Sequence, residues 1–251
     1  MINLLICGAN GRMGKKVYEA VCLDDNMVAV CGIDRFEDFS NPTYPVYDSF
    51  DKVDNAVDVI IDFSSPASLD SILTFATAKG IPCILCSTGY TEEHIAKVQN
   101  ASAKIALFRS ANMSLGVNVI LDLVKKASQA LYGFDIEIIE KHHHNKVDAP
   151  SGTALMLADA VKEALPEKFY VYGREGIVGK RNADEIGIHA VRGGNIVGEH
   201  DVIFAGESET VTISHQATDR AVFAQGAITA AKFIIGKKPG LYSMKDVLNA
   251  K

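Results

Sequence analysis

The chain has 251 residues, of which 48% are hydrophobic, and carries a formal net charge of −6 at pH 7. Such a length suits one large domain or two small ones around a substantial core. The acidic balance argues against nucleic acid or an anionic membrane as the main partner. We find no signal peptide pattern and no uncharged apolar run long enough to span a bilayer, and therefore expect a cytoplasmic protein.

The first half of the chain alternates short apolar runs with helical patterns. The expected strands are 2–7, 27–33, 57–63, 81–85 and 104–108, and the expected helices are 15–23, one opened by Pro66, and 91–101. Runs that are apolar on both faces and alternate with helices are typical of a parallel sheet covered on both sides. Residues 1–113 are therefore predicted to form a Rossmann-like, doubly wound α/β domain, with 35–52 as an irregular loop.

The pattern changes after Asn112. A long amphipathic helix is expected over 114–131, then a strand over 134–142, a helix over 151–164 and a loop over 166–185. Strands over 186–192, 195–205 and 209–215 are expected to form an antiparallel meander, followed by helices over 222–235 and 244–248. We predict an α+β domain with a mixed or antiparallel sheet at 114–221, and we expect 222–251 to complete the first domain.

A glycine-rich turn follows the first expected strand and opens the first helix: Gly8-Ala9-Asn10-Gly11-Arg12-Met13-Gly14. Glycines let a backbone approach a pyrophosphate, whose charge the helix N-terminus favours. Asp34 ends the next strand, where an acid accepts hydrogen bonds from ribose hydroxyls, and Arg35 after it could pair with a 2′-phosphate. We predict a site for NADH or NADPH, with the choice open. The alternative is a turn that only tightens the strand–helix junction.

Polar residues also follow two later strands of this predicted sheet. Ser87-Thr88-Gly89 follows one, and Ser110-Ala111-Asn112-Met113 follows another. Ligands in such folds bind outside the carboxyl ends of the strands. These side chains could therefore contact the nicotinamide half of a cofactor, although ordinary turns use the same residue types.

All five cysteines lie within the first 86 residues of the chain. Their odd number and this placement do not suit a disulfide framework, which favours a reducing compartment. Cys83 and Cys86 form a C-x-x-C pair that could indicate redox or metal chemistry. The pair lies within an apolar run, however, and buried cysteine behaves mostly as a small hydrophobe.

The segment from Glu140 to Ala160 concentrates the residues best suited to chemistry. His142, His143, His144 and Lys146 precede a helix that starts at Ser151. Imidazoles and an ammonium supply protons and positive charge, and a helix start supplies N–H donors, which together suit a small anion. Metal binding is an alternative, but no further ligands are suitably spaced nearby, and we predict no metal. Incidental histidines in a solvated loop are the other alternative.

Taken together, these motifs resemble the 4-hydroxy-tetrahydrodipicolinate reductase (dihydrodipicolinate reductase) family. The resemblance covers nearly the whole chain and rests on GxxGRMG at the N-terminus, STG after the fourth strand, ANxSxGVN at 111–118, E-x-HHxxKxDAPSGTA from Glu140, and VRxGxIVGEH at 191–200. It implies reduction of a cyclic imine dicarboxylate of lysine and diaminopimelate biosynthesis by NADH or NADPH. It also implies a homotetramer built through the second domain, which would bind the substrate.

The resemblance implies roles for individual residues. His142 would be the catalytic proton donor or acceptor, and Lys146 the second acid. The substrate carboxylates would be held by His143, Ser151, Gly152 and Thr153. The cofactor would be lined by Gly8, Ala9, Asn10, Gly11, Arg12, Met13, Asp34, Arg35, Cys86, Ser87, Thr88, Ser110, Ala111, Asn112 and Met113.

Two positions depart from the family's usual pattern. Cys86 stands where the family often has glycine, which affects the expected nicotinamide contacts, and His144 stands where it often has arginine. Another two-domain NAD(P)-dependent dehydrogenase, acting on an amino acid or a sugar, is the main alternative. A cofactor-sensing protein would not need His142 or Lys146, and metal analysis would test for a zinc hydrolase.

Overall fold

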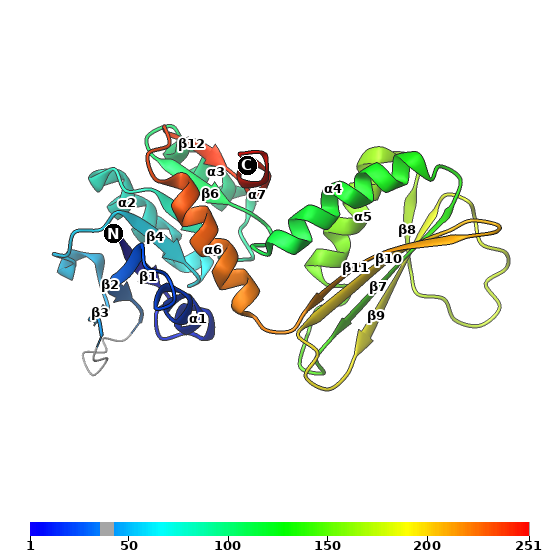
Figure 1. Cartoon of the computed structure of the whole chain (residues 1–251), viewed down its shortest axis with the longest axis horizontal. Coiled ribbons are helices and arrows are strands. Elements are labelled where there is room, and N and C mark those ends of the chain that lie inside the picture. Colours follow the sequence, from blue (N-terminus) through cyan, green and yellow to red (C-terminus); the bar gives the residue numbers. More distant parts are fainter. Residues whose placement is uncertain (36–42, 251) are drawn as a thin grey trace. The chain divides into compact units, whose positions relative to one another are not determined.

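Two structural units, each with its own sheet, make up the chain (Figure 1). The computed structural model describes residues 1–35 and 43–250. The first unit comprises Met1–Ser114 and Arg220–Lys251, and the second comprises Leu115–Asp219. None of the helices in the described residues is long and apolar enough to cross a membrane.

The first unit contains a seven-stranded sheet in which every neighbouring pair of strands is parallel. The strand order is β12-β6-β5-β4-β1-β2-β3. The bounds are β1 Ile2–Cys7, β2 Met27–Ile33, β3 Val46–Tyr47, β4 Val59–Asp62, β5 Cys83–Leu85, β6 Ala106–Arg109 and β12 Gly240–Tyr242. The predicted doubly wound parallel sheet is confirmed.

Helices pack against both faces of this sheet. They are α1 Arg12–Val21, α2 Leu69–Lys79, α3 Glu92–Ser102, α6 Ala221–Ile234 and α7 Met244–Asn249. One face of the sheet supplies Leu5, Ile60 and Leu107 to a buried cluster with Ile72 of α2 and Val98 of α3. Helices α1 and α6 contact each other, and they also contact strands of this sheet. Both faces are therefore covered, which explains why the strands are apolar throughout.

The topology places the glycine-rich turn at a functional position. Strand β1 lies between β2 and β4, so the chain reverses its direction of winding at this point of the sheet. In open parallel sheets, ligands bind outside the carboxyl ends of the strands at such a reversal. The turn that follows Cys7 occupies this position.

Two short strands of this unit were not predicted. The expected irregular loop 35–52 contains β3 and a 3-10 helix, Phe50–Lys52, while its residues 36–42 lie outside the described part of the chain. Strand β12, which pairs with β6 at the other edge, follows α6. Two or three residues are too few to show a period, which is why the sequence pattern missed both strands.

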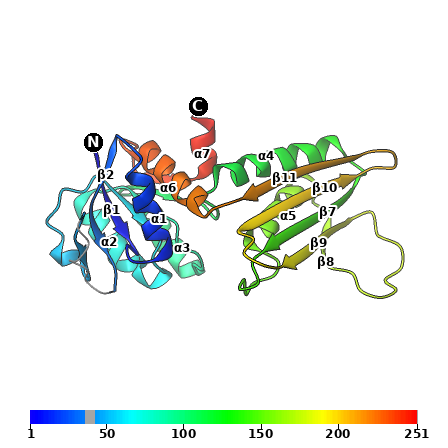
Figure 2. The ribbon, with the colours of Figure 1, turned by 60° about the horizontal axis from the view of Figure 1, so that its bottom comes forward.

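The second unit contains a five-stranded mixed sheet in the order β11-β10-β7-β9-β8 (Figure 2). The bounds are β7 Asp135–His142, β8 Phe169–Tyr172, β9 Glu185–Arg192, β10 Gly198–Ala205 and β11 Thr210–Ala217. The predicted meander is wrong, because β9 pairs in parallel with β7 and β8 and not with β10. The predicted loop 166–185 is also wrong in part, since it includes β8. Only β10 and β11 form the expected antiparallel hairpin.

Two helices cover one face of this sheet: α4 Leu115–Ala130 and α5 Gly152–Ala164. Their apolar stripes meet alternate sheet residues in a second buried cluster. It includes Val124 of α4, Leu157 of α5, and Ile138, Ile188 and Phe204 of the sheet. Within the described residues of this unit, no helix covers the opposite face, which carries partly exposed side chains such as Glu137 and Lys141.

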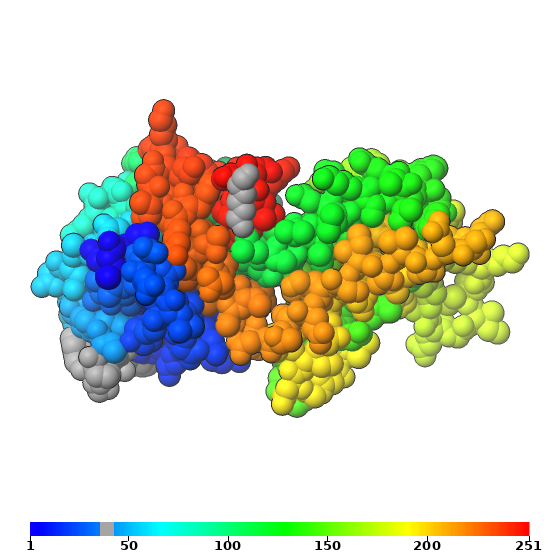
Figure 3. Space-filling view, in the orientation of Figure 1, coloured from blue at the N-terminus to red at the C-terminus, as the bar shows by residue number. Residues whose placement is uncertain are grey.

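A protruding segment joins β8 to β9. Figure 3 shows it as a yellow-green projection from the second unit, and Ile177 and Val178 within it are exposed. Two arginines fasten it to the sheet through Glu137: Arg174 forms two 2.9 Å contacts with the carboxylate, and Arg181 donates at 3.0 Å. Burial alone would raise the pKa of Glu137, but these partners and His189 outweigh burial and lower the pKa to about 2.

Acid should therefore destabilise the chain through Glu137. Because the folded-state pKa of about 2 lies below the ordinary value of 4.5, the contribution is present above the unfolded pKa and is lost as the pH falls toward the folded one. Over that range we expect this one group to lower the unfolding free energy by about 2–3 kcal/mol. Melting temperatures from about pH 5 to about pH 3 should fall more steeply for the natural chain than for Glu137→Gln; equal slopes would contradict this.

Candidate functional site

The glycine-rich turn brings backbone atoms unusually close together. Gly8 has a φ of 77°, and a Cβ added to it would lie 2.9 Å from the Phe63 carbonyl oxygen. A Cβ added to Gly14 would lie 2.2 Å from the Gly8 carbonyl oxygen. The Gly11 N–H donates to that same carbonyl at 3.0 Å. Side chains are excluded from this cradle, so the geometry fits the close approach of a pyrophosphate.

Asp34 ties the turn to the end of β2. Its carboxylate accepts the Asn10 N–H at 2.8 Å and the Arg35 N–H at 2.7 Å. Each oxygen has further lone pairs that ribose hydroxyls could use. Arg35, next in the chain, is exposed. Asp34, which suits the ribose hydroxyls of NADH, and Arg35, which suits the 2′-phosphate of NADPH, are therefore adjacent.

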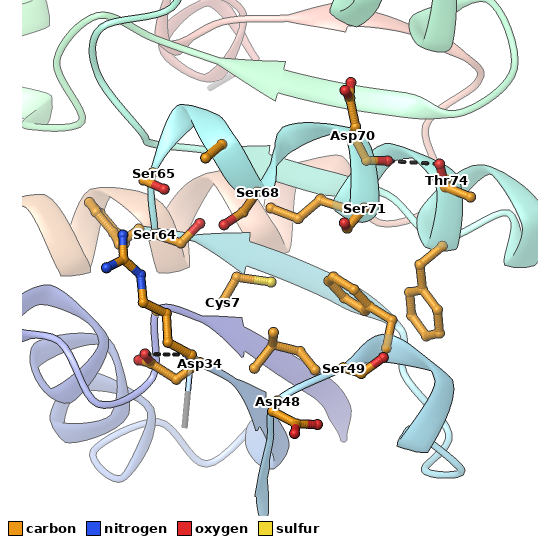
Figure 4. Close-up of a pocket in the computed structure, with 18 of the residues that line it drawn as sticks. Cys7, Asp34, Asp48, Ser49, Ser64, Ser65, Ser68, Asp70, Ser71 and Thr74 are labelled. Carbon is orange, nitrogen blue, oxygen red and sulfur yellow. Dashed lines mark hydrogen bonds between the residues drawn. The ribbon is translucent and has the colours of Figure 1, made fainter. Parts of the chain in front are cut away.

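A cavity of about 830 Å³ lies beside the turn. Of the predicted cofactor residues, four line it: Gly8, Gly11, Asp34 and Arg35. Figure 4 shows Asp34 on one side of this cavity and Ser64 and Ser65 on the other. Asp48, Asp51 and Asp70 also line it, so Arg35 is its one cation among the described lining residues. A volume of this size suits a nucleotide portion of a cofactor.

A second cavity, of about 550 Å³, adjoins the first, since Phe63 and Ser64 line both. Nine more of the predicted cofactor residues line this second cavity: Arg12, Met13, Cys86, Ser87, Thr88, Ser110, Ala111, Asn112 and Met113. Ala9 and Asn10 line neither cavity. Ala9 is 2% exposed, and Asn10 contributes its backbone N–H to Asp34.

A fully buried carboxylate supports the second cavity, and the sequence analysis did not single it out. Asp62 ends β4 and accepts hydrogen bonds from Ser87 Oγ at 2.8 Å, from the Ser64 N–H at 2.8 Å and from Ser64 Oγ. Burial raises its pKa. Asp62 thus joins the ends of β4 and β5, whose serines line the cavity. The available signal was an acidic residue within an otherwise apolar strand.

The C-x-x-C pair lies in the core. Cys83 and Cys86 are buried, and burial raises the pKa of both thiols far above the ordinary value. The thiolate is the form that binds metals and exchanges disulfides. The interpretation of both residues as buried hydrophobes agrees with this environment, although Cys86 also lines the second cavity.

In the second unit, His142 is held by a buried carboxylate two residues before it. His142 ends β7, is 9% exposed, and its Nδ1 lies 2.6 Å from Glu140 Oε2. Arg192 of β9, which lies beside His142 in the sheet, donates to both Glu140 oxygens at 2.7 and 2.6 Å. The Ser151 N–H donates to Oε1 at 3.0 Å. Burial favours a raised pKa for Glu140, but Arg192 and His142 outweigh burial and lower it.

This environment fixes the proton on the histidine ring. An ionised carboxylate can only accept hydrogen bonds, so the short contact requires Nδ1 to carry the proton and donate it. Nε2 is then the nitrogen available to exchange a proton. A second imidazole, His200, lies edge-on with its ring centroid 5.2 Å away. Burial and the nearby His142 lower the pKa of His200 to about 4, so it stays neutral near pH 7.

The start of α5 lies in the same unit as this pair. Ser151 caps the helix by accepting the Ala154 N–H at 3.1 Å, and its hydroxyl also lies 2.9 Å from His200 Nε2. The Gly152 N–H, at the first helical position, has no acceptor within the helix. Gly152 is exposed, and an added Cβ would meet nothing within 4 Å. The helix dipole and this open donor suit a carboxylate.

Lys146 supplies positive charge in the loop between β7 and α5. Its ammonium lies 2.8 Å from Asp148, and this contact lowers the pKa of that carboxyl. The other two histidines lie beyond the end of the strand: His143 is half-buried and His144 is exposed. Among the described residues, no cluster of three or more potential ligands could hold a metal.

The residues that support His142 lie within the quoted motifs, but no role for them was predicted from the sequence. Glu140 and Arg192 are about fifty positions apart, and His200 is on another strand. Each follows an ordinary alternating pattern, so only the pairing of β7 with β9 and β10 brings them together. A buried acid and base on neighbouring strands would have been the signal, but it required the sheet order.

Comparison with known proteins identifies the family. The model for "Dihydrodipicolinate reductase, N-terminus" matches residues 2–113, and the one for "Dihydrodipicolinate reductase, C-terminus" matches 116–248. The chain belongs to the dihydrodipicolinate reductase family. It is accordingly a reductase with a nicotinamide cofactor, and its Rossmann-like sheet and glycine-rich turn agree with this.

Individual relatives extend over the full length of the chain. It is 52% identical to 4-hydroxy-tetrahydrodipicolinate reductase from Caldanaerobacter subterraneus subsp. tengcongensis, covering 99% of this chain and 98% of the relative. It is 47% identical to the enzyme of that name from Clostridium tetani, covering 100% and 98%. The fold matches a dipicolinate-bound dihydrodipicolinate reductase from Paenisporosarcina sp. TG-14 with a TM-score of 0.81, 24% identity, and coverage of 98% and 99%.

Proposed function

We propose that the chain reduces 4-hydroxy-tetrahydrodipicolinate to tetrahydrodipicolinate in lysine and diaminopimelate biosynthesis, with release of water and use of one proton. The observation that carries this proposal is His142, held by buried Glu140 in the unit that also carries Lys146 and the start of α5. The family membership supports the same reaction. We place the enzyme in the cytoplasm, where its five free thiols are compatible with a reducing environment.

The substrate would be a dianion, and the second unit offers the groups that it needs. To supply the proton, His142 carries one on each ring nitrogen, donates the one on Nε2 and keeps the one on Nδ1 that Glu140 accepts. Lys146 is the second acid and a positive partner. His143, Gly152 and Thr153 hold the carboxylates at the helix start. Ser151 contributes differently from the sequence-based prediction: its N–H and hydroxyl already serve Glu140, Ala154 and His200, so we assign it to building the helix start.

The first unit would hold the cofactor. The predicted residues around the two cavities orient it, with the glycine-rich turn beneath the pyrophosphate and Ser87, Thr88 and Asn112 toward the nicotinamide. When bound, NADH or NADPH supplies the hydride. Asp62 keeps the strand-end serines in place.

The direct test follows the loss of NADH or NADPH absorbance with freshly generated substrate. We expect oxidation of the cofactor only when the cyclic imine dicarboxylate is present. Absence of that turnover together with activity on an amino acid or a sugar would instead support a different two-domain dehydrogenase. Parallel assays with both cofactors also measure the preference.

Arg35 should matter for NADPH alone. A guanidinium that meets the 2′-phosphate contributes a charge-assisted hydrogen bond, which NADH cannot make. For Arg35→Ala we expect the KM for NADPH to rise about tenfold, which corresponds to about 1.4 kcal/mol. The KM for NADH should change by less than about twofold. Lys16→Ala, in the same unit but outside both cavities, is the control. An equal rise for both cofactors would contradict this role.

We also propose that the second unit carries the subunit contacts of a homotetramer. The support is its sheet, one face of which is not covered by a helix among the described residues of that unit. Sedimentation equilibrium would test the proposal, with four copies of a 27.0 kDa chain as the expected mass. A monomer at working concentrations would contradict it.

A further inference from the structure

Glu140 is hydrogen-bonded in a way that only a carboxylate can satisfy. Oε2 accepts from His142 Nδ1 and from Arg192, and Oε1 accepts from the Ser151 N–H and from Arg192. All four groups in contact with the two oxygens are donors: one from His142, one from Ser151 and two from Arg192. A glutamine amide would present N–H groups to at least two of these donors, so it cannot reproduce the arrangement. The carboxylate is fully buried, which makes the loss of these contacts costly.

The opposite nitrogen of the same ring faces a glycine. A Cβ added to Gly198, the first residue of β10, would lie 3.1 Å from His142 Nε2 and 3.5 Å from Cδ2. Such a contact is tighter than side chains normally tolerate. Gly198 does not have a positive φ, so its backbone conformation does not require glycine. The space at Nε2 is what its missing side chain provides. Among the described residues, Nε2 has no hydrogen-bond partner.

We propose that Glu140 and Gly198 are positioning residues that together determine which nitrogen of His142 meets the substrate: Glu140 fixes the proton on Nδ1, and Gly198 keeps the space at Nε2 open. Arg192 holds Glu140 in the ionised form that this requires. The inference rests on the proposed function of His142 as the proton-transfer group. Neither residue touches the reacting atoms, so both act through His142.

The first measurement needs no substrate. Nitrogen-15 NMR of histidine-labelled protein, at a pH where His142 is neutral, distinguishes a ring protonated on Nδ1 from one protonated on Nε2. The signal is assigned with His142→Ala. We expect the Nδ1–H form in the natural protein and in Gly198→Ala, and a mixture of forms in Glu140→Gln. An Nε2–H ring in the natural protein would overturn the proposal even if no variant folded.

The second measurement is kinetic. Glu140→Gln should lower kcat about a hundredfold or more, because a displacement of a catalytic group by about 1 Å already costs about that factor. Gly198→Ala should lower kcat about tenfold while the KM for the imine changes less than about threefold, because proton transfer suffers more than binding. The matched control is Gly193→Ala, in the connection from β9 to β10 that leads to Gly198, where an added Cβ meets nothing within 4 Å. Its kcat should stay within about twofold of the natural value.

The outcomes separate this inference from the proposed function. If the natural protein shows the Nδ1–H form but does not reduce the imine, the proposed function fails and the assignment of Glu140 stands. If it reduces the imine but Gly198→Ala keeps the natural kcat and a natural melting temperature, the role of Gly198 is wrong. If Gly198→Ala raises the KM for the imine but leaves kcat unchanged, the role of Gly198 is also wrong.

Discussion

Replacing His142 or Lys146 by alanine is expected to lower kcat by about a hundredfold or more in each case. The reason for His142 is the loss of the imidazole that Glu140 holds ready for proton exchange. For Lys146 it is the loss of a second acid and of a positive partner for the dianion. The affinity for NADH or NADPH should be unchanged, since both residues lie in the second unit and the cofactor residues lie in the first. Steady-state kinetics and a fluorescence titration of the cofactor measure the two effects.

His144→Ala is the matched control for these variants. It removes an imidazole from the same segment, but one that is exposed and has no assigned role. Its kcat should stay within about twofold of the natural value. Natural turnover in both His142→Ala and Lys146→Ala would refute the assignment of the proton-transfer groups.

Gly14→Ala should damage both the stability of the first unit and its affinity for the cofactor. The new Cβ would lie 2.2 Å from the Gly8 carbonyl oxygen and 2.8 Å from Ala9 Cα, which are backbone atoms that cannot rotate away. The backbone of Gly8 and Ala9 must then move away from the start of α1 to make room for the methyl group. We expect a loss of about 1–3 kcal/mol of stability. Cofactor affinity should fall about tenfold or more, because the backbone that approaches the pyrophosphate is displaced.

Gly240→Ala offers the comparison for this variant. It adds the same methyl group to the same unit, but the new Cβ would meet only the Tyr242 ring at ordinary contact distances from 3.4 Å. Its melting temperature and cofactor titration should match those of the natural chain. Natural cofactor affinity in Gly14→Ala would show that the turn does not cradle the cofactor.

Long, strongly patterned elements could be predicted from the sequence, and the pairing between them could not. The run Ile2–Cys7 could be predicted because it is a continuous apolar segment that ends at a glycine-rich turn, and the helices over Leu115–Ala130 and after Ser151 because their apolar residues recur with the helical period. Strand β8 has four residues between Pro166 and Gly173, too few for a period to separate it from a loop. The parallel pairing of β9 with β7 depends on packing against α5 and on sheet order, which alternation along one strand does not contain.

The same distinction applies to the candidate site. Gly8, Asp34, Lys146 and His142 could be singled out because their residue types are unusual at those places in the pattern. The roles of Asp62, Glu140 and Gly198 could not be predicted, since each depends on a contact with a residue distant in sequence: Ser87, Arg192 and His142 respectively. A carboxylate becomes a positioning group only when a strand pairing encloses it, and a glycine becomes a spacer only when a ring faces it.

The bond from the Ser151 N–H to Glu140 has an entropic consequence for the loop that carries Lys146. It joins two residues eleven positions apart, and Arg192 also donates to the Asp148 carbonyl at 2.7 Å. Bringing together the ends of a flexible loop of about this length costs roughly 2 kcal/mol. That cost is met when the second unit folds. Under the proposed function, an arriving dianion would therefore find the ammonium and the helix start already held in place, and its binding energy would not be needed to order them.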